Sequence, residues 1–266
     1  MTTGTTGAAD EQRLRKEIAR LAPWHHKVQI TAAVSTEASG AREAGADAAT
    51  ISFMDAAQHF GGLIEDIFPD GLAGRSVLDC ACNCGAYLFW AKERGAGSGF
   101  GFDARAAWIE QARFLAAHRE FPSDGLTFEV HELHDLPALG LGLFDVTLFF
   151  GILYHLPDPV TGLQIAADLT REILIVNTAT RTGLADGMLA LARENPAHPL
   201  SGVDGLHWFP TGPGVVQAML ESMGFLETCC VWNTDDTANQ PPGIGRLIMV
   251  AARQQGRLNG LKEAFA

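Results

Sequence analysis

Residues 77–85 read VLDCACNCG, and this stretch decides the fold of the chain. A short apolar run ends there in a tight turn of small residues, and a helical pattern follows. Ligands of wound α/β sheets bind at this edge, where a strand runs into such a turn. Small side chains allow a ligand to approach the backbone, and Asn83 and Gly85 adopt positive φ angles at little cost. The stretch therefore predicts the ligand-binding turn of an α/β sheet.

The chain on both sides of this turn alternates between short apolar runs and helical patterns. We predict strands at 75–80, 98–103, 126–131, 144–150, 172–178, 225–232 and 246–252, and helices at 85–94, 105–119 and 158–170. This alternation is typical of a parallel sheet with crossover helices. Because only a loop joins the last two strands, we expect an antiparallel finish. The predicted fold is α/β, a doubly wound, mostly parallel seven-stranded sheet with an antiparallel last strand and an N-terminal helical cap.

The segments outside this sheet define the expected domain boundaries. Helical apolar spacing occurs at 11–21 and 47–67, and a brief strand is expected at 27–30. The expected organisation is a disordered tail at 1–10, a helical cap or lid at 11–70, an α/β domain at 71–254 with an insertion at 181–208, and a C-terminal tail at 255–266. Within the insertion we expect a helix near 187–193.

The composition restricts the partners that the chain is expected to bind. Against 19 basic residues there are 31 acidic ones, a formal net charge of −12 that repels polyphosphate, so nucleic acid is disfavoured and a small-molecule substrate is expected. Residues 1–10 resemble neither a signal peptide nor an anchor, and no membrane segment is expected. Five cysteines without framework spacing predict a reducing, cytoplasmic compartment. Homo-oligomerisation stays open.

Two acidic residues at strand ends indicate which cofactor the turn binds. The charge of Asp79 would oppose a pyrophosphate but favours a ligand that carries an ammonium and a sulfonium. Asp103 lies 24 residues later and closes the next strand, where it can accept hydrogen bonds from both hydroxyls of a ribose. The alternative is a purely structural role, in which Asp79 caps a helix and Asp103 pairs with Arg105. The coincidence of both acids with the turn instead predicts S-adenosylmethionine rather than NAD.

The turn resembles the first motif of the class I methyltransferases, which reads hydrophobic, hydrophobic, Asp, any, Gly, any, Gly, any, Gly. Here Ala81 and Asn83 replace the first two glycines, and the methyl group of Ala81 would narrow the methionine pocket. Residues 132–133 follow the third strand, where the adenine lies in that family, and 144–151 match its fourth-strand station. The resemblance implies a cofactor-binding set of Asp79, Ala81, Cys82, Asn83, Gly85, Asp103, Ala104, Glu132, Leu133 and Phe150.

Further motifs are similar to one branch of that family. Residues 151–156 (GILYHL) and 23–26 (PWHH) resemble the wobble-uridine tRNA carboxymethyltransferase group, and 208–211 (WFPT) and 224–225 (GF) extend the similarity. It covers about residues 20 to 252. The resemblance is specific for the cofactor class and only suggestive for the substrate, because that group also resembles small-molecule methyltransferases.

The expected catalytic residues follow from the chemistry of a sulfonium donor. The cofactor carries the reactive methyl group, so the protein mainly aligns nucleophile, carbon and sulfur. His155, after the fourth strand, is the predicted general base, with Tyr154 orienting the acceptor and His26 as an alternative base. A capping or packing role for His155 stays open. The expected substrate-binding residues are Trp24, His25, Lys27 and Trp208.

No metal site is expected, because Cys80, Cys82 and Cys84 alternate along a strand and do not have zinc-ligand spacing.

Three functions stay open from the sequence. The leading hypothesis is methyl transfer to an oxygen, nitrogen or carbon of a small specialised metabolite. The second is methylation or carboxymethylation of a tRNA wobble uridine, which the motifs favour and the net charge opposes. The third is a non-catalytic, cofactor-binding partner subunit in which Ala81 has spoiled productive alignment.

Overall fold

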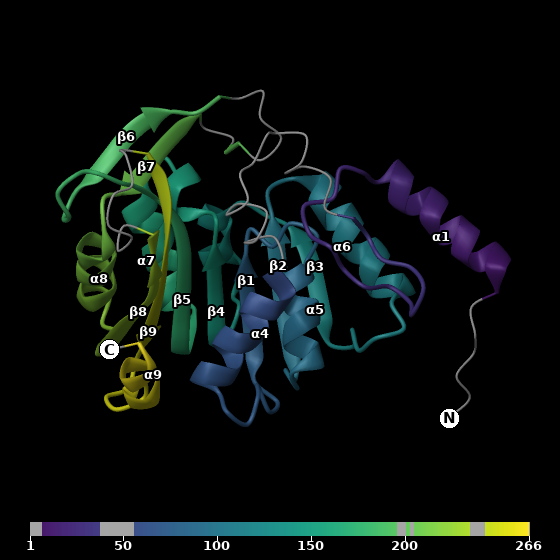
Figure 1. Ribbon diagram of the computed structural model, residues 1–266, viewed down its shortest axis with the longest axis horizontal. Coiled ribbons are helices and arrows are strands. Elements are labelled where there is room, and N and C mark those ends of the chain that lie inside the picture. Colours follow the sequence, from purple (N-terminus) through teal and green to yellow (C-terminus); the bar gives the residue numbers. More distant parts are fainter. Residues whose placement is uncertain (1–6, 38–55, 196–200, 203–204, 235–242, 266) are drawn as a thin grey trace.

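The main sheet is mostly parallel and has seven strands in the order β3-β2-β1-β4-β5-β9-β8 (Figure 1). The computed structural model describes residues 7–37, 56–195, 201–202, 205–234 and 243–265. The strands of this sheet are β1 (Ser76–Cys80), β2 (Ser98–Asp103), β3 (Leu126–Val130), β4 (Phe144–Phe150), β5 (Thr170–Arg181), β8 (Glu227–Asn233) and β9 (Ile244–Ala252).

The register of the central strands places their carboxyl ends side by side at the edge where the ligand is predicted to bind. Strand β1 pairs in parallel with β2 and β4, so that Asp79 lies opposite Gly101 on one side and Leu148 on the other. Strand β9 runs antiparallel to both β5 and β8. The predicted seven-stranded sheet with an antiparallel last strand is therefore confirmed.

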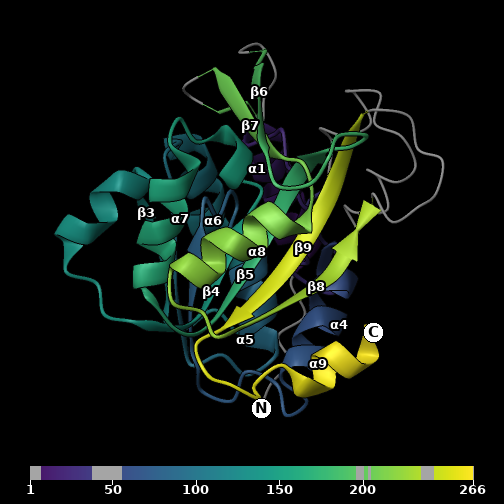
Figure 2. The same ribbon diagram turned by 90° about the vertical axis from the view of Figure 1, so that its left-hand side faces the viewer.

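Helices cover both faces of the sheet. On one face, residues of α4 (Ala56–Ile67), α5 (Ala86–Glu93) and α6 (Ala106–His118) pack with β1 in one buried cluster. On the other, α7 (Pro159–Asp168) and α8 (Pro213–Ser222) pack with a second cluster (Figures 1 and 2). The remaining described helices are α1 (Ala8–Arg20), α9 (Asn259–Ala264) and the 3-10 turns η1 (Leu133–Leu139) and η2 (Leu153–His155).

The N-terminal helical cap is present and is built into the helix layer. Trp24, Val28 and Ile30 are buried in the same cluster as α6. Gln111 on α6 donates hydrogen bonds to the carbonyl oxygens of Leu21 and Pro23, so the segment after α1 is tied down by polar contacts as well. Among the helices of the described residues, none is long and apolar enough to cross a bilayer.

The insertion differs from its prediction. Residues 187–193 were expected to be helical, but β6 (Leu189–Arg193) pairs antiparallel with β7 (Leu206–Pro210) in a separate hairpin. Leucine and alanine favour a helix locally, yet partner strand β7 supplies backbone hydrogen bonds, and such tertiary pairing overrides weak propensity. Strand β7 packs against η2 and β5, so the hairpin lies over the carboxyl end of β4.

Three further predictions, for one strand and for the two chain ends, also differ from the structure. The predicted strand at 27–30 is wrong, because its described backbone makes only an isolated bridge between Gln29 and Ser35. The expected tail at 255–266 contains α9, and α1 begins at Ala8 within the expected disordered tail. The first part of the helix predicted at 47–67 falls outside the described residues.

Candidate functional site

The turn after β1 contains three residues in the left-handed region of backbone conformation. Ala81, Asn83 and Gly85 have φ angles of 57°, 52° and 76°. The positive φ expected of Asn83 and Gly85 is confirmed, and Ala81 adopts one as well, where a Cβ costs about 1 to 2 kcal/mol. At Gly85 a Cβ would also lie 2.4 Å from the ring of Phe128, so only glycine fits. The turn leads directly into α5.

Asp103 joins the end of β2 to this turn. One carboxylate oxygen accepts a hydrogen bond from the Arg105 amide at 2.9 Å, and the other accepts from the Asn83 amide at 3.1 Å. Burial raises the pKa of Asp103, and the two amide hydrogen bonds oppose that rise. Each oxygen retains a lone pair, so the carboxylate can still accept hydrogen bonds from a ligand hydroxyl. The pairing of Asp103 with Arg105 that the sequence left open is thus a hydrogen bond to the backbone amide of Arg105.

Asp79 is a buried carboxylate that lacks a compensating partner. Its side chain belongs to a residue only 1% exposed, and Oδ2 has no hydrogen-bond partner among the described residues. Burial raises the pKa of Asp79 well above its ordinary value, and the charge of Asp103 adds to the rise. A cationic group placed beside Oδ2 would stabilise the ionised carboxylate. The residues present therefore fit the ammonium and sulfonium groups of an adenosyl cofactor.

The other expected cofactor residues lie around the same edge. Cys82 is buried, and its amide donates to the carbonyl of Phe102, which ties the turn to β2. Glu132 precedes η1, and its charge contributes to the raised pKa of Asp103. Leu133 is buried, Ala104 stands between Asp103 and Arg105, and Phe150 ends β4. Their roles as cofactor contacts stay predictions.

A cavity of about 720 Å³ is lined by residues of α4, α5, β4, β5, β8 and β9. Its lining includes Phe60 from α4, Tyr87 from α5 and Phe150 from β4, whose rings contact one another edge to face. Asn177, which pairs with Phe150 in the sheet, also lines it. The volume suits a small ligand, and the lining combines these rings with the polar or charged residues Gln58, His59, Glu65, Asp66, Arg94 and Asn177.

The histidines of the PWHH motif lie next to this cavity. His26 is 6% exposed and packs between Tyr87 and Trp90, with ring centroids 5.2 and 5.8 Å away. Burial lowers the pKa of His26 well below its ordinary value, and burial with the charge of Arg246 lowers the pKa of His25 to about 4. Both imidazoles are therefore neutral at pH 7, as a base must be.

The remaining residues of that segment are placed differently. Trp24 is 2% exposed and donates its indole N–H to the carbonyl of Ile18 at 2.8 Å, which makes it a core residue beside α6. Lys27 is exposed. Trp208 on β7 donates to the carbonyl of Pro157 at 3.2 Å, and strand alternation directs it away from the face that carries His207. Substrate binding by these three residues stays a prediction.

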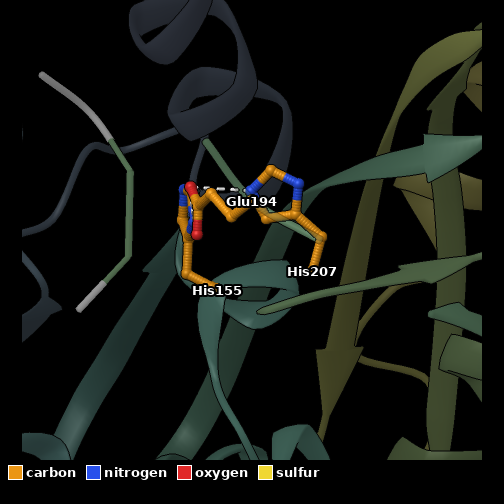
Figure 3. A group of neighbouring side chains, drawn as sticks. All are labelled: His155, Glu194 and His207. Carbon is orange, nitrogen blue, oxygen red and sulfur yellow. Dashed lines mark ion pairs between the residues drawn. The ribbon is translucent and has the colours of Figure 1, made fainter. Parts of the chain in front are cut away.

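His155 belongs to a cluster that sequence reasoning missed (Figure 3). Its Nδ1 lies 2.9 Å from Oε1 of Glu194, and Nε2 of His207 lies 2.7 Å from the same oxygen. The Glu194 side chain is only 2% exposed. The ring of Tyr154 contacts His155, with centroids 4.2 Å apart, and stacks on Phe209. The alternation of His207 and Phe209 along a strand could have indicated that both side chains lie on one face of the hairpin. No pattern in the sequence indicated Glu194.

The ionisation of the cluster follows from burial and mutual contact. Burial lowers the pKa of His155, with opposition from Glu194 and reinforcement from His207 and Arg105. Burial acts to raise the pKa of Glu194, but the contacts with His207 and His155 outweigh it and hold that pKa below its ordinary value. At neutral pH the cluster thus presents one carboxylate and a neutral His155.

Comparison with known sequences relates these features to a family. A family model described as "Methyltransferase domain" matches residues 72–199. A "tRNA U34 carboxymethyltransferase" of Campylobacter hominis is 38% identical over 93 residues, covering 35% of this chain and 31% of that protein. One from Pseudomonas aeruginosa is 30% identical over 162 residues, covering 60% of this chain and 48% of that protein. The chain thus spans half or less of the length of these relatives.

Solved structures share the fold. The N-terminal domain of EvdMO1, determined in the presence of SAH and D-fucose, has a TM-score of 0.71 at 18% identity and covers 93% of this chain and 100% of that chain. Magnesium protoporphyrin IX methyltransferase from Synechocystis PCC 6803, with bound SAH, has a TM-score of 0.54 at 14% identity and covers 92% and 96%. Residues 72–199 thus match a methyltransferase domain, and the chain shares its fold with solved structures that include a methyltransferase.

Proposed function

We propose that this protein binds S-adenosylmethionine and transfers its methyl group to a small-molecule acceptor. The observation that carries the proposal is the unpartnered Oδ2 of Asp79, buried beside Asp103 at the turn after β1. Two carboxylates in such proximity favour a positively charged ligand over a phosphate-bearing one.

In this proposal each acidic residue holds a different part of the cofactor. Asp103 accepts hydrogen bonds from the ribose hydroxyls, and Asp79 stabilises the positive charge of the methionine portion. The turn at 81–85 brings the backbone close enough for that portion to lie against it. The bound sulfonium supplies an activated methyl group, and the chain contributes alignment and a site that excludes water.

We propose that the acceptor enters beside Tyr154 and His155, next to the cavity lined by Tyr87 and Phe150. The net charge of −12 supports a small acceptor over a polyanion. The EvdMO1 domain was determined in the presence of a small sugar, D-fucose, which supports a hydroxyl-bearing acceptor. His26, which is neutral and buried against the ring of Tyr87, is the second polar candidate on this side.

Calorimetric titration with S-adenosylhomocysteine tests the cofactor part. We expect binding by the wild type, no binding of NAD, and at least about 10-fold weaker binding by Asp103→Ala, because two hydrogen bonds to a charged group are lost. Asp124→Ala is the matched control, since that acid has a side chain 88% exposed and pairs only with Lys92 in the contacts of the described residues. Binding of NAD in place of the adenosyl ligand would refute the proposal.

Turnover tests the acceptor part. Radiolabelled S-adenosylmethionine is incubated with a set of hydroxylated small molecules that includes D-fucose, and His155→Phe is compared with His131→Phe. We expect His155→Phe to slow methyl transfer while the affinity for S-adenosylhomocysteine stays unchanged. Unchanged turnover in His155→Phe would remove that residue from the acceptor site.

A tRNA acceptor is the second candidate, favoured by the name of the relatives from Campylobacter hominis and Pseudomonas aeruginosa. Filter binding with total tRNA over a salt series separates the two candidates. Tight retention that weakens steeply with salt would support the tRNA candidate, whereas absence of retention at low salt would exclude it. Cofactor binding without turnover on either class of acceptor would support the non-catalytic partner subunit.

A further inference from the structure

We propose that His155, Glu194 and His207 form a binding site for one divalent transition-metal ion at the rim of the acceptor site. The binding of the ion is independent of the proposed function, and only its use on the acceptor rests on that function. The sequence analysis expected no metal from the spacing of the cysteines, and these three residues share no spacing motif because they are 39 and 13 positions apart along the chain. The hairpin β6–β7 brings them together over η2.

The separations of the donor atoms match those around an ion. Oε1 of Glu194 lies 2.9 Å from Nδ1 of His155 and 2.7 Å from Nε2 of His207. Two ligands at about 2.1 Å from an ion and at right angles to each other are about 3 Å apart. One ligand atom from each of the three residues can be chosen so that all lie within 4.8 Å of one another. An ion can therefore enter with small side-chain adjustments.

Hydrogen bonding alone leaves this cluster unsatisfied. Glu194 Oε2 and His207 Nε2 are buried without a hydrogen-bond partner among the described residues, although Nε2 lies so close to Oε1. Nδ1 of His155 lies 3.2 Å from the amide of Gly202, which is a donor, and 2.9 Å from Oε1 of Glu194, which is an acceptor, so neither tautomer of a neutral imidazole satisfies both contacts. A cation coordinated by both Nδ1 of His155 and Oε1 of Glu194 would satisfy the two atoms together.

The donor set indicates the class of ion. Two imidazole nitrogens and one carboxylate suit zinc, cobalt, manganese or iron in the divalent state, whereas magnesium and calcium prefer oxygen ligands. Three protein ligands leave coordination positions open, as in catalytic rather than structural sites. The side chains of His155 and His207 are 18% and 21% exposed, so an exchangeable ligand can approach.

The location of the cluster would allow a bound ion to activate the acceptor. Tyr154 contacts both imidazoles, and Arg246 lies over its ring and donates to Asn177, which lines the cavity. An acceptor hydroxyl bound to the ion would lose its proton to water more readily. The resulting oxygen attacks the methyl carbon, the carbon–sulfur bond breaks, and its electron pair stays on sulfur. In this arrangement His155 is a ligand, which replaces the base role that the sequence predicted for it.

The test is titration of the chelator-treated full chain with Co²⁺, followed by calorimetry and by visible absorption of the bound ion. We expect one equivalent to bind to the wild type, with at least about 10-fold weaker binding by Glu194→Gln and by His207→Ala, since each removes one ligand. His131→Ala is the matched control, because His131 also lies 2.9 Å from a glutamate, Glu129, but has no third donor among the described residues. We expect it to bind Co²⁺ like the wild type.

Several outcomes would overturn the proposal. These are no stoichiometric Co²⁺ in the wild type, undiminished binding by His207→Ala, or a thiolate-to-cobalt absorption that assigns the ion to the five cysteines. If Glu194→Gln does not fold, the partly exposed His207→Ala carries the test alone. Affinity for S-adenosylhomocysteine is measured on the same samples. Its absence in the wild type would refute the proposed function and leave the metal site standing, whereas loss of Co²⁺ alone would refute only the metal site.

Discussion

Replacing Asp79 with asparagine tests the central carboxylate through stability and affinity together. Burial raises the pKa of Asp79 well above its ordinary value, so the folded chain retains a proton that the unfolded chain releases from about pH 3.9 upward. The free energy of unfolding of the wild type therefore falls as pH rises, until the pH passes the folded pKa. The substitution Asp79→Asn mimics the protonated acid, and its side chain contributes no such pH dependence.

The magnitude follows from proton linkage. One proton bound by the folded but not the unfolded chain changes the free energy of unfolding by about 1.4 kcal/mol per pH unit. The stability of Asp79→Asn relative to the wild type should thus grow by up to that amount for each pH unit above the unfolded pKa of about 3.9, until the pH reaches the raised pKa of the folded chain. The affinity for S-adenosylhomocysteine should fall about 10- to 100-fold, because a contact between its ammonium and a carboxylate is lost.

Urea unfolding at several pH values, with and without S-adenosylhomocysteine, measures both quantities. Asp124→Asn is the control, because that carboxylate is exposed and its substitution should leave both unchanged. A stability difference that does not vary with pH would refute the assignment of a raised pKa to Asp79. Unchanged ligand affinity would refute its contact with the cofactor.

Three further substitutions test the packing around the turn and the helix layer by urea unfolding. Ala81→Gly should leave stability unchanged or raise it by up to about 1 kcal/mol, because it relieves the positive φ of 57°; a clear loss would contradict this. Gly101→Ala should destabilise by about 1 to 3 kcal/mol, since the new Cβ would lie 2.9 Å from Sγ of Cys82; a neutral result would show that the neighbours yield. Arg119→Leu should cost about 3 kcal/mol, because the carbonyl of Gln29 and the carboxylate of Glu93 lose a buried partner, and a cost below about 1 kcal/mol would contradict it.

The sheet could be predicted because its signals are local. Strands β1, β2 and β4 are buried between two helix layers, so each reads as a short apolar run, and turns of small residues separate them from helices. The turn at 81–85 was recognisable for the same reason. The strained φ of Ala81 was not, because nothing in its identity indicates the left-handed region.

The hairpin and the His–Glu–His cluster could not be predicted from local patterns. Residues 189–193 have side chains that favour a helix, and only pairing with 206–210 makes them a strand. Glu194 and His155 are brought together by that pairing and by nothing nearer in sequence. The burial of Trp24 beside α6 could not be predicted either, because an aromatic residue in a recognisable motif is compatible with the substrate site as well as with the core, and its substrate role stays a prediction.

The burial of residues 21–34 has a consequence for how this protein can be dissected. The family match begins at residue 72, yet Trp24, Val28, Ile30 and Val34 are each 2% exposed or less in the core shared with α6. A fragment that starts at residue 72 would therefore expose to water the apolar surface of α6 that these residues cover, and it would aggregate rather than fold. Here the boundary recognised by sequence similarity and the boundary of the cooperative folding unit are different places on the chain.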